Sequence, residues 1–164
     1  MDDYANVPTY SGIGGANART VSLWVKTSAS GVYQALVQWG ADATGQLWML
    51  RLLTDGTVTV AAYGGGVQST QTVVDGQWHH IAAVLDEGQT DSGQIRLYVN
   101  GQLDAAPYAG TCTVNTSLTM PVHIGVWNQY STGNKVNYFQ GLMDEVRIYE
   151  RALSAAEVAA LAND

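Results

Sequence analysis

The stretch DGQWHHIAAVLDEGQTDSGQIRLYVNG, Asp75–Gly101, decides the fold of this chain. The dipeptides Asp75-Gly76 and Asn100-Gly101 tolerate positive φ, so we expect each of them to close a tight hairpin. Trp78–Leu85 is apolar nearly throughout, which is typical of a strand buried on both faces. Ile95–Asn100 alternates apolar and polar residues, the period of a half-buried strand. The segment therefore predicts two β-strands bounded by turns.

Turn signals recur about every ten residues, a spacing typical of a β-sandwich or jelly roll. The other predicted strands are Thr20–Lys26, Val32–Trp39, Leu47–Leu53, Thr57–Tyr63, Val67–Val74, Pro121–Val126 and Val136–Tyr149, the last bending at Gly141. Near the end of the chain, Ser154 and Glu157 form a capping box, which predicts one short helix. We predict an all-β jelly-roll β-sandwich of two antiparallel sheets with one short C-terminal helix, as a single domain over residues 1–164.

Composition excludes several functional classes. The 164 residues carry a net charge of −7, and only 13% of them are charged. No basic cluster is available for a nucleic-acid backbone or an anionic membrane, and no run of 18 apolar residues predicts a membrane span.

Met1 directly precedes Asp2-Asp3-Tyr4, which already resembles domain sequence, so we expect a module excised from a longer protein. Cys112 is the only cysteine; it forms no intrachain disulfide and is expected to be a small, partly buried thiol.

Four segments in order carry a family resemblance. They are DDYANVP at residues 2–8, RTVSLWVKT at 19–27, DGQWHHIAAVLD with IRLYVNG within 75–101, and YFQGLMDEVRIYERALSAAEVAAL at 138–161. Together they resemble the laminin-G-like branch of the concanavalin-A-like lectin/glucanase superfamily. The resemblance implies a jelly roll with one concave sheet. It also implies a module of a secreted or cell-surface protein, and we expect that protein to be bacterial.

The same superfamily contains glycoside hydrolases, which depend on catalytic acids and other reactive side chains. Retaining hydrolysis needs two carboxylates about 5–5.5 Å apart, whereas the adjacent pairs Asp86-Glu87 and Asp144-Glu145 diverge if they lie in strands. His79 and His80 are expected on opposite faces of one strand, and His123 within a sheet, with no zinc site or nucleophilic triad around them. We therefore expect no enzyme, and a glycoside hydrolase ranks third among the possible functions.

The resemblance also implies calcium, because many laminin-G-like sandwiches carry this ion. Calcium takes carboxylate and carbonyl oxygens in sites built from loops. Asp2-Asp3 and Asp144 match the segments that the family uses near its ion, and jelly-roll topology tends to bring the first and last strands together. We predict that Asp3 and Asp144 share one structural calcium ion. The alternative is that Asp144 caps a turn and that Asp3 is a solvated terminal residue.

Aromatic composition points to a ligand site. Five Trp and nine Tyr stand against one Phe, and Trp and Tyr join a flat apolar face to a polar group, which suits both sugar stacking and protein interfaces. We expect Trp24 and Trp78 in the core. The predicted ligand-binding residues are Trp127, Asn128, Tyr130 and Tyr138 around the loop after Gly125, with Trp39, Trp48 and Tyr63 on the concave sheet. The alternative is that these aromatic residues only cover loop backbone.

These observations predict a non-catalytic, lectin-like carbohydrate-binding module of a larger secreted or cell-surface protein. Its expected partners are poly- or oligosaccharides and neighbouring domains of the parent protein. A protein-interaction, adhesion or structural assembly module without sugar binding is the alternative, which exposed strand edges would favour.

Overall fold

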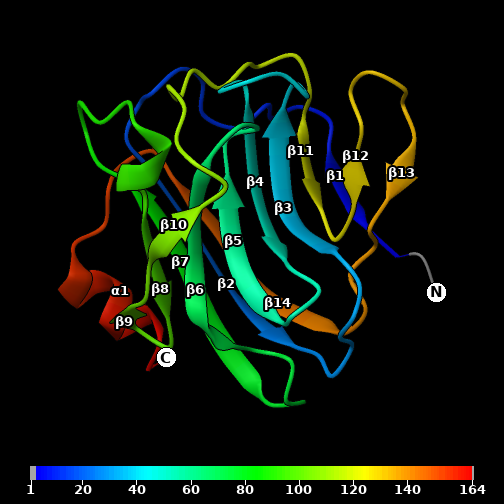
Figure 1. Cartoon of the computed structure of the whole chain (residues 1–164), viewed down its shortest axis with the longest axis vertical. Helices are drawn as coiled ribbons and strands as arrows, with labels where there is room; N and C mark the ends of the chain where they lie inside the picture. Colours follow the sequence, from blue (N-terminus) through cyan, green and yellow to red (C-terminus); the bar gives the residue numbers. More distant parts are fainter. Residues whose placement is uncertain (1–2, 164) are drawn as a thin grey trace.

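The computed structural model describes residues 3–163, which form two antiparallel β-sheets with one hydrophobic core between them (Figure 1). The larger sheet has seven strands in the order β1 (Ala5–Val7), β11 (Val122–Ile124), β3 (Gln34–Gly40), β4 (Leu47–Leu52), β5 (Thr57–Ala61), β6 (Gly66–Thr72) and β10 (Ala106–Tyr108). The second sheet has the order β14 (Leu142–Tyr149), β2 (Arg19–Lys26), β7 (Trp78–Leu85), β8 (Arg96–Val99) and β9 (Gln102–Leu103). A ribbon of β12 (Trp127–Asn128) and β13 (Lys135–Val136), the 3-10 helix η1 (Ser92–Gln94) and the helix α1 (Ala155–Leu161) complete the fold. The predicted all-β jelly-roll class is confirmed.

Both predicted turns are present, but only one of them closes a hairpin. Asn100 and Gly101 have φ angles of 51° and 76° and close the β8–β9 hairpin, as predicted. Asp75-Gly76 also makes a turn, but it lies between β6 in the seven-stranded sheet and β7 in the other. It therefore carries the chain from one sheet to the other, and the prediction of a hairpin there is wrong. A dipeptide specifies the local backbone angles but not the partners of the strands on either side.

The predicted strand over residues 136–149 is interrupted. β13 ends at Val136 and β14 begins at Leu142, with the intervening residues outside any strand. A Cβ atom at Gly141 would lie 2.3 Å from the carbonyl oxygen of Lys26, so only glycine allows the chain to approach β2 there. The capping box is present as predicted, with the Ser154 hydroxyl accepting from the Glu157 amide.

Trp39 and Trp48 lie in the core, which corrects the prediction that they line a ligand-binding surface. Both are 0% exposed, and their rings stack with centroids 5.8 Å apart. They face each other across β3 and β4, while Gln38 and Met49 form the next pair and point to the opposite face. A shift of one residue in register would have exchanged the two faces.

Trp24 and Trp78 show the converse error, since neither lies in the core. Trp78 is 39% exposed and Trp24 is half-buried. Both occupy the outer face of the five-stranded sheet, because Leu23 and Val25 take the inward positions of β2. Part of this outer face is covered by α1, whose Val158 packs in a second apolar cluster.

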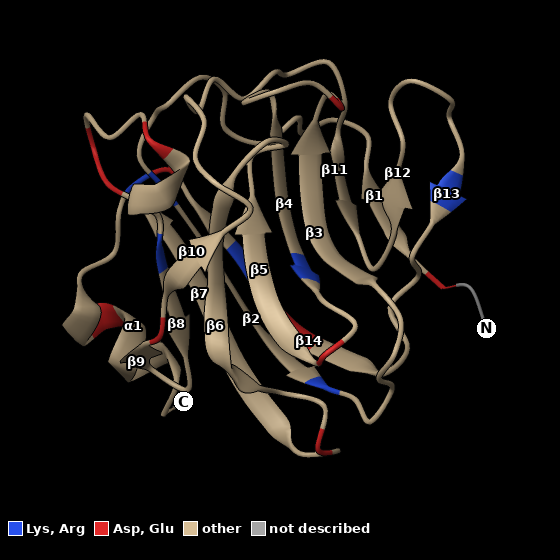
Figure 2. Cartoon of the chain, viewed as in Figure 1, with Lys and Arg blue, Asp and Glu red and all other residues tan. Residues whose placement is uncertain are grey.

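Charged residues are spread over the described chain and form no basic patch (Figure 2). Residues 3–163 contain no helix with the length and apolar character needed to cross a membrane.

Candidate functional site

A pocket of about 310 Å³ opens on the outer face of the seven-stranded sheet, the face turned away from the core. We call it the sheet pocket. Its apolar lining comes from Leu47, Met49 and Ala61, and its polar and aromatic lining comes from Arg51, Tyr63, Tyr108 and Trp127. These residues belong to four segments that are distant in sequence, so the fold alone brings them together.

Strand alternation in β4 creates the floor of the sheet pocket. Successive side chains of a strand point to opposite faces, and the hexapeptide LWMLRL is apolar on both. The inward set, which packs in the core, is Trp48, Leu50 and Leu52. The outward set, which lines the pocket, is Leu47, Met49 and Arg51.

Two tyrosines of the sheet pocket come from different segments, Tyr63 from the turn after β5 and Tyr108 from β10. Tyr63 has a φ of 50°, which turns the chain back toward β6, and its side chain remains 43% exposed. A Cβ atom at Gly65 would lie 2.6 Å from the carbonyl oxygen of Gly110, so a glycine is needed where the two segments meet. Tyr108 reaches the pocket from β10, which pairs with β6.

Arg51 lies close to two aromatic rings. Its guanidinium carbon lies 5.2 Å from the ring centroid of Tyr33 and 5.9 Å from that of Tyr108. Its Nη2 donates a hydrogen bond of 3.0 Å to the Tyr108 hydroxyl. These cation–π contacts fix the position of the charge beside the pocket.

Trp127 forms the wall opposite the sheet strands. The residue begins β12, and its indole Nε1 donates to a carboxylate oxygen of Asp42 over 3.3 Å. This bond leaves the carbon edges and faces of the ring as its remaining contact surface. The indole is therefore oriented before any ligand arrives.

A hydrogen-bonded chain of polar side chains lies on the same outer face. Gln38 donates to the backbone oxygen of Asn128 over 2.9 Å, and Asn128 Nδ2 lies 3.0 Å from His123 Nε2. His123 Nδ1 lies 2.9 Å from the carbonyl oxygen of Pro121 and therefore carries the proton that it donates. Burial lowers the pKa of His123 below its ordinary value, with the charge of Lys135 adding to this effect, so the ring is neutral at pH 7.

Several buried polar atoms on this face have no partner among the described residues. They are Gln38 Oε1, Asn128 Oδ1 and Arg51 Nε. A buried donor or acceptor without a partner destabilises a fold by about 1–3 kcal/mol. Such groups are therefore candidates for bonds to a ligand or to ordered water.

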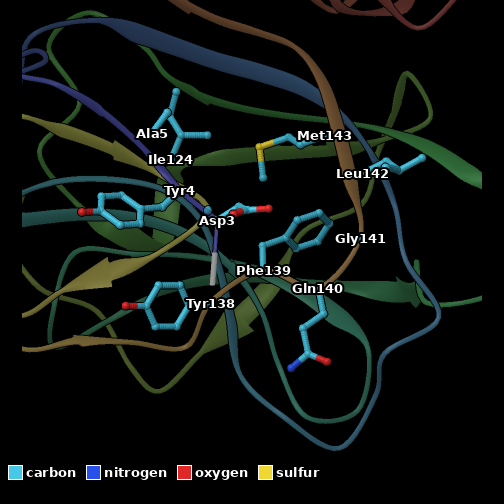
Figure 3. Close-up of a pocket in the computed structure, with 11 residues that line it drawn as sticks. Asp3, Tyr4, Ala5, Ile124, Tyr138, Phe139, Gln140, Gly141, Leu142 and Met143 are labelled. Carbon is cyan, nitrogen blue, oxygen red and sulfur yellow. The ribbon is translucent and has the colours of Figure 1, made fainter. Parts of the chain in front are cut away.

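A larger cavity, of about 860 Å³, lies between β1 and β14, where both sheets end (Figure 3). We call it the edge pocket. Tyr4 and Tyr138 lie side by side at its rim with ring centroids 6.3 Å apart, and Asp3 reaches into its centre. Phe139 and Met143, which pack on the core, form part of its lining. Its lining includes the carboxylate of Asp3, whereas no Asp or Glu is among the described residues that line the sheet pocket.

The residues predicted to bind a ligand therefore separate into groups. Trp127 and Tyr63 meet in the sheet pocket, and Tyr138 lies in the edge pocket. Asn128 belongs to the neighbouring chain of polar side chains. Tyr130 is 52% exposed and lines neither pocket. Arg51 and Tyr108 were not predicted.

The carboxylates predicted to bind calcium do not form a complete ligand set. Asp3 lines the edge pocket, but Asp144 does not, and its Oδ1 accepts a hydrogen bond of 2.8 Å from the Glu145 amide. Met143 packs on the core, so Asp144, the next residue of β14, points to the other face. In the described ranges no three His, Cys, Asp or Glu side chains are grouped to hold a metal ion. Asp2 lies outside the described residues. Calcium needs six to eight oxygens, and these side chains alone do not supply them.

Calcium binding stays a prediction, and thermal unfolding tests it. An ion shared by Asp3 and Asp144 binds only the folded state, so millimolar calcium should raise the melting temperature and EDTA should lower it. Asp144→Asn should remove both shifts. Equal melting temperatures with calcium and with EDTA would show that no such ion contributes to stability.

Comparison with known proteins identifies the relatives of this chain. A family model described as the concanavalin A-like lectin/glucanases superfamily matches residues 1–159. A search of curated proteins found no match.

Solved structures share the fold at low sequence identity. The CBM40 of the Ruminococcus gnavus IT-sialidase, bound to α2,3-sialyllactose, is 15% identical with a TM-score of 0.67, over 98% of each chain. Domain 4 of AbnA, an extracellular arabinanase from Geobacillus stearothermophilus, in complex with arabinotriose, is 23% identical with a TM-score of 0.61, over 92% of this chain and 68% of that one. The LG4-5 domains of the mouse laminin α1 chain are 18% identical with a TM-score of 0.58, over 92% of this chain and 41% of that one.

Proposed function

Because the chain belongs to the concanavalin A-like lectin/glucanases superfamily, we propose that it is a non-catalytic carbohydrate-binding module of a larger secreted or cell-surface protein. The sugar binds in the sheet pocket. The observation that carries this proposal is the meeting of Trp127, Tyr63 and Tyr108 with Arg51 in one cavity.

The chemistry of the sheet pocket suits a saccharide. An aromatic ring stacks on the apolar face of a pyranose, while hydroxyls of the sugar need donors and acceptors at the ring edge. Arg51 and the Tyr63 and Tyr108 hydroxyls provide such groups in the pocket. The volume of about 310 Å³ lies at the lower end of the range of ligand pockets, which favours a short saccharide. The bound saccharides of the Ruminococcus and Geobacillus structures support this class of ligand.

A binding role is favoured over hydrolysis because the sheet pocket lacks the necessary acids. Glycoside hydrolysis uses two carboxylates that flank the scissile bond, and no Asp or Glu is among the described residues that line this pocket. Asp86, one of the candidate acids, is instead bound by Arg96 through both carboxylate oxygens.

A second candidate function is favoured by the edge pocket. β1 and β14 are the outermost strands of their sheets on this side, and Leu142, 59% exposed, lies beside the cavity. Free sheet edges and exposed apolar side chains are features of protein interfaces. A protein-interaction module that uses the edge pocket is therefore the alternative.

Glycan binding separates these two functions. A glycan array that includes α2,3-sialyllactose and arabinotriose identifies the tightest saccharide, and its dissociation constant is then measured by titration calorimetry. Trp127→Ala should weaken this binding by about tenfold or more, because it removes the stacking surface. Tyr63→Ala should weaken it in the same direction.

Tyr130→Ala is the matched control, since it removes an exposed tyrosine from the same loop without touching either pocket. It should leave affinity unchanged. A loss of affinity in Tyr138→Ala but not in Trp127→Ala would move the site to the edge pocket. Absence of binding to every glycan would favour the protein-interaction module.

A further inference from the structure

Arg51 differs from the other arginines of the described chain in its partners. Arg96, Arg147 and Arg151 each form an ion pair with a carboxylate. Arg19 is saturated by backbone carbonyl oxygens. Arg51 has neither kind of acceptor in residues 3–163, and its one hydrogen bond goes to a tyrosine hydroxyl. It is therefore a cation without an anion.

The surroundings of Arg51 hold this cation beside the sheet pocket. Its side chain is half-buried and lines the sheet pocket, and the rings of Tyr33 and Tyr108 lie close to the guanidinium. Its Nε is buried without an acceptor, and the single bond to Tyr108 leaves further N–H groups free. Planar N–H groups in a fixed fork match the two oxygens of a carboxylate.

The charge at the sheet pocket differs in sign from the charge of the whole protein. The net charge of −7 disfavours an anion at long range. Of the two arginines of residues 3–163 without a carboxylate partner, Arg19 is saturated by carbonyl oxygens and Arg51 is not, so the positive charge of Arg51 dominates only close to the pocket. Asp42, an acid in contact with the pocket lining, is already bonded to the Trp127 indole. Electrostatics at this pocket therefore favours an anionic ligand over a neutral one of the same shape.

We propose that the sheet pocket recognises a carboxylate-bearing saccharide, with the carboxylate paired to Arg51 and the sugar ring packed against Trp127. This inference rests on the proposed function, since it assumes that the sheet pocket binds sugar. It adds the charge of the ligand and assigns Arg51 as the residue that sets specificity. The carboxylate belongs to a uronic acid or to a sialic acid, which offer the same chemistry to the guanidinium.

Matched pairs of saccharides test the proposal. Oligogalacturonides and their methyl esters share one sugar backbone, and esterification replaces the negative charge of each carboxyl group with a methyl group. α2,3-Sialyllactose and lactose differ by the whole acidic sugar. We expect the charged member of at least one pair to bind about tenfold or more tightly than its neutral counterpart. The pair that shows the preference identifies the source of the carboxylate. Raising the salt concentration should reduce this preference.

Variants of Arg51 show whether this residue causes the preference for the charged saccharide. Arg51→Met should weaken binding of the charged member much more than that of the neutral one, and Arg51→Lys, which keeps the charge without the fork, should fall between wild type and Arg51→Met. Lys135→Met removes the same charge from outside the sheet pocket and should keep the preference. If Arg51→Met fails to fold, the affinities of the wild-type protein for the charged and neutral saccharides, and their dependence on salt, still test whether the pocket prefers a carboxylate.

The outcomes separate this inference from the proposed function. Equal affinities within both pairs, with binding still lost in Trp127→Ala, would overturn the role of Arg51 and leave the sugar site intact. A preference that Arg51→Met does not change would overturn it as well. Absence of any Trp127-dependent saccharide binding would overturn both proposals.

Discussion

Replacing Arg19 by methionine is expected to lower the free energy of unfolding by roughly 3 kcal/mol or more. Arg19 is 0% exposed and has no carboxylate partner among residues 3–163. Its guanidinium donates to the carbonyl oxygens of Ile13, Gly15 and Asn17 at 2.7–2.9 Å. It also donates to the hydroxyl of Thr116 over 3.0 Å, so one side chain joins two loops that are distant in sequence.

Burial disfavours the charged form of Arg19 and lowers the pKa of its guanidinium to about 10. The group therefore remains charged at neutral pH. The guanidinium also lies 5.0 Å from the ring centroid of Trp48 in the core. Methionine fills similar space but leaves several carbonyl oxygens without a donor, and their lost bonds account for the expected cost.

Urea denaturation measures the effect, since the midpoint and slope give the free energy of unfolding. Arg19→Lys retains the charge but not the fork of donors, so it should also be clearly destabilised. Arg151→Met removes an exposed arginine that pairs with Glu157 and is the matched control; it should change stability little. If Arg19→Met were as stable as Arg151→Met, the carbonyl bonds would have no net value.

Local sequence signals predicted the class of fold, because its hairpins and strands are specified locally. Asn100-Gly101 gave the β8–β9 hairpin, and the capping box at Ser154 gave α1. Pairing partners were not specified in this way, which is why Asp75-Gly76 was assigned to a hairpin although it links the two sheets. Trp39 was assigned to the surface for a related reason: in a strand apolar on both faces, alternation alone does not say which face points inward.

Only some residues of the sheet pocket were predicted from the sequence, because local signals do not show which distant segments meet in the fold. Trp127 was found because it stands among amide residues in a predicted loop, and Tyr63 because it was placed on the concave sheet at the end of a predicted strand. Tyr108 comes from a segment with loop composition, 57 residues from the Arg51 that it bonds, and no local signal connects them. Arg51 could have been found from the sequence, because the charged group of an arginine within the apolar run LWMLRL must reach solvent or a polar site on one face of its strand.

Acidification is expected to destabilise the protein between about pH 6.5 and pH 4 through His80. The side chain is 1% exposed, and neither ring nitrogen has a hydrogen-bond partner in the described structure. The ring of Trp24 lies 5.4 Å away, edge to face, and the Asn100 side chain accepts from the backbone of His80 and not from its ring. Burial, with a further contribution from the charge of Arg147, lowers the pKa of His80 from 6.5 to about 4.

The direction of the effect follows from proton binding. Between the folded pKa of about 4 and the unfolded value of 6.5, the unfolded chain binds a proton that the folded chain does not, so stability rises with pH across this window. A shift of this size corresponds to roughly 3 kcal/mol, absent above pH 6.5 and fully developed below pH 4. Asp55 and Asp104 have pKa values lowered from 3.8, so their stabilising contributions are lost only at still lower pH.

Urea denaturation across this pH range, on wild type and His80→Leu, measures the contribution of His80. Leucine keeps apolar contact with Trp24 and does not titrate, so the stability of the variant relative to wild type should improve by roughly 3 kcal/mol from pH 7 to pH 4. The pKa of His123 is also lowered by burial, and His123→Gln, as the matched control, separates its smaller contribution. Parallel pH profiles for wild type and His80→Leu would contradict the assignment, because an unpartnered buried imidazole must lose stability when it is protonated.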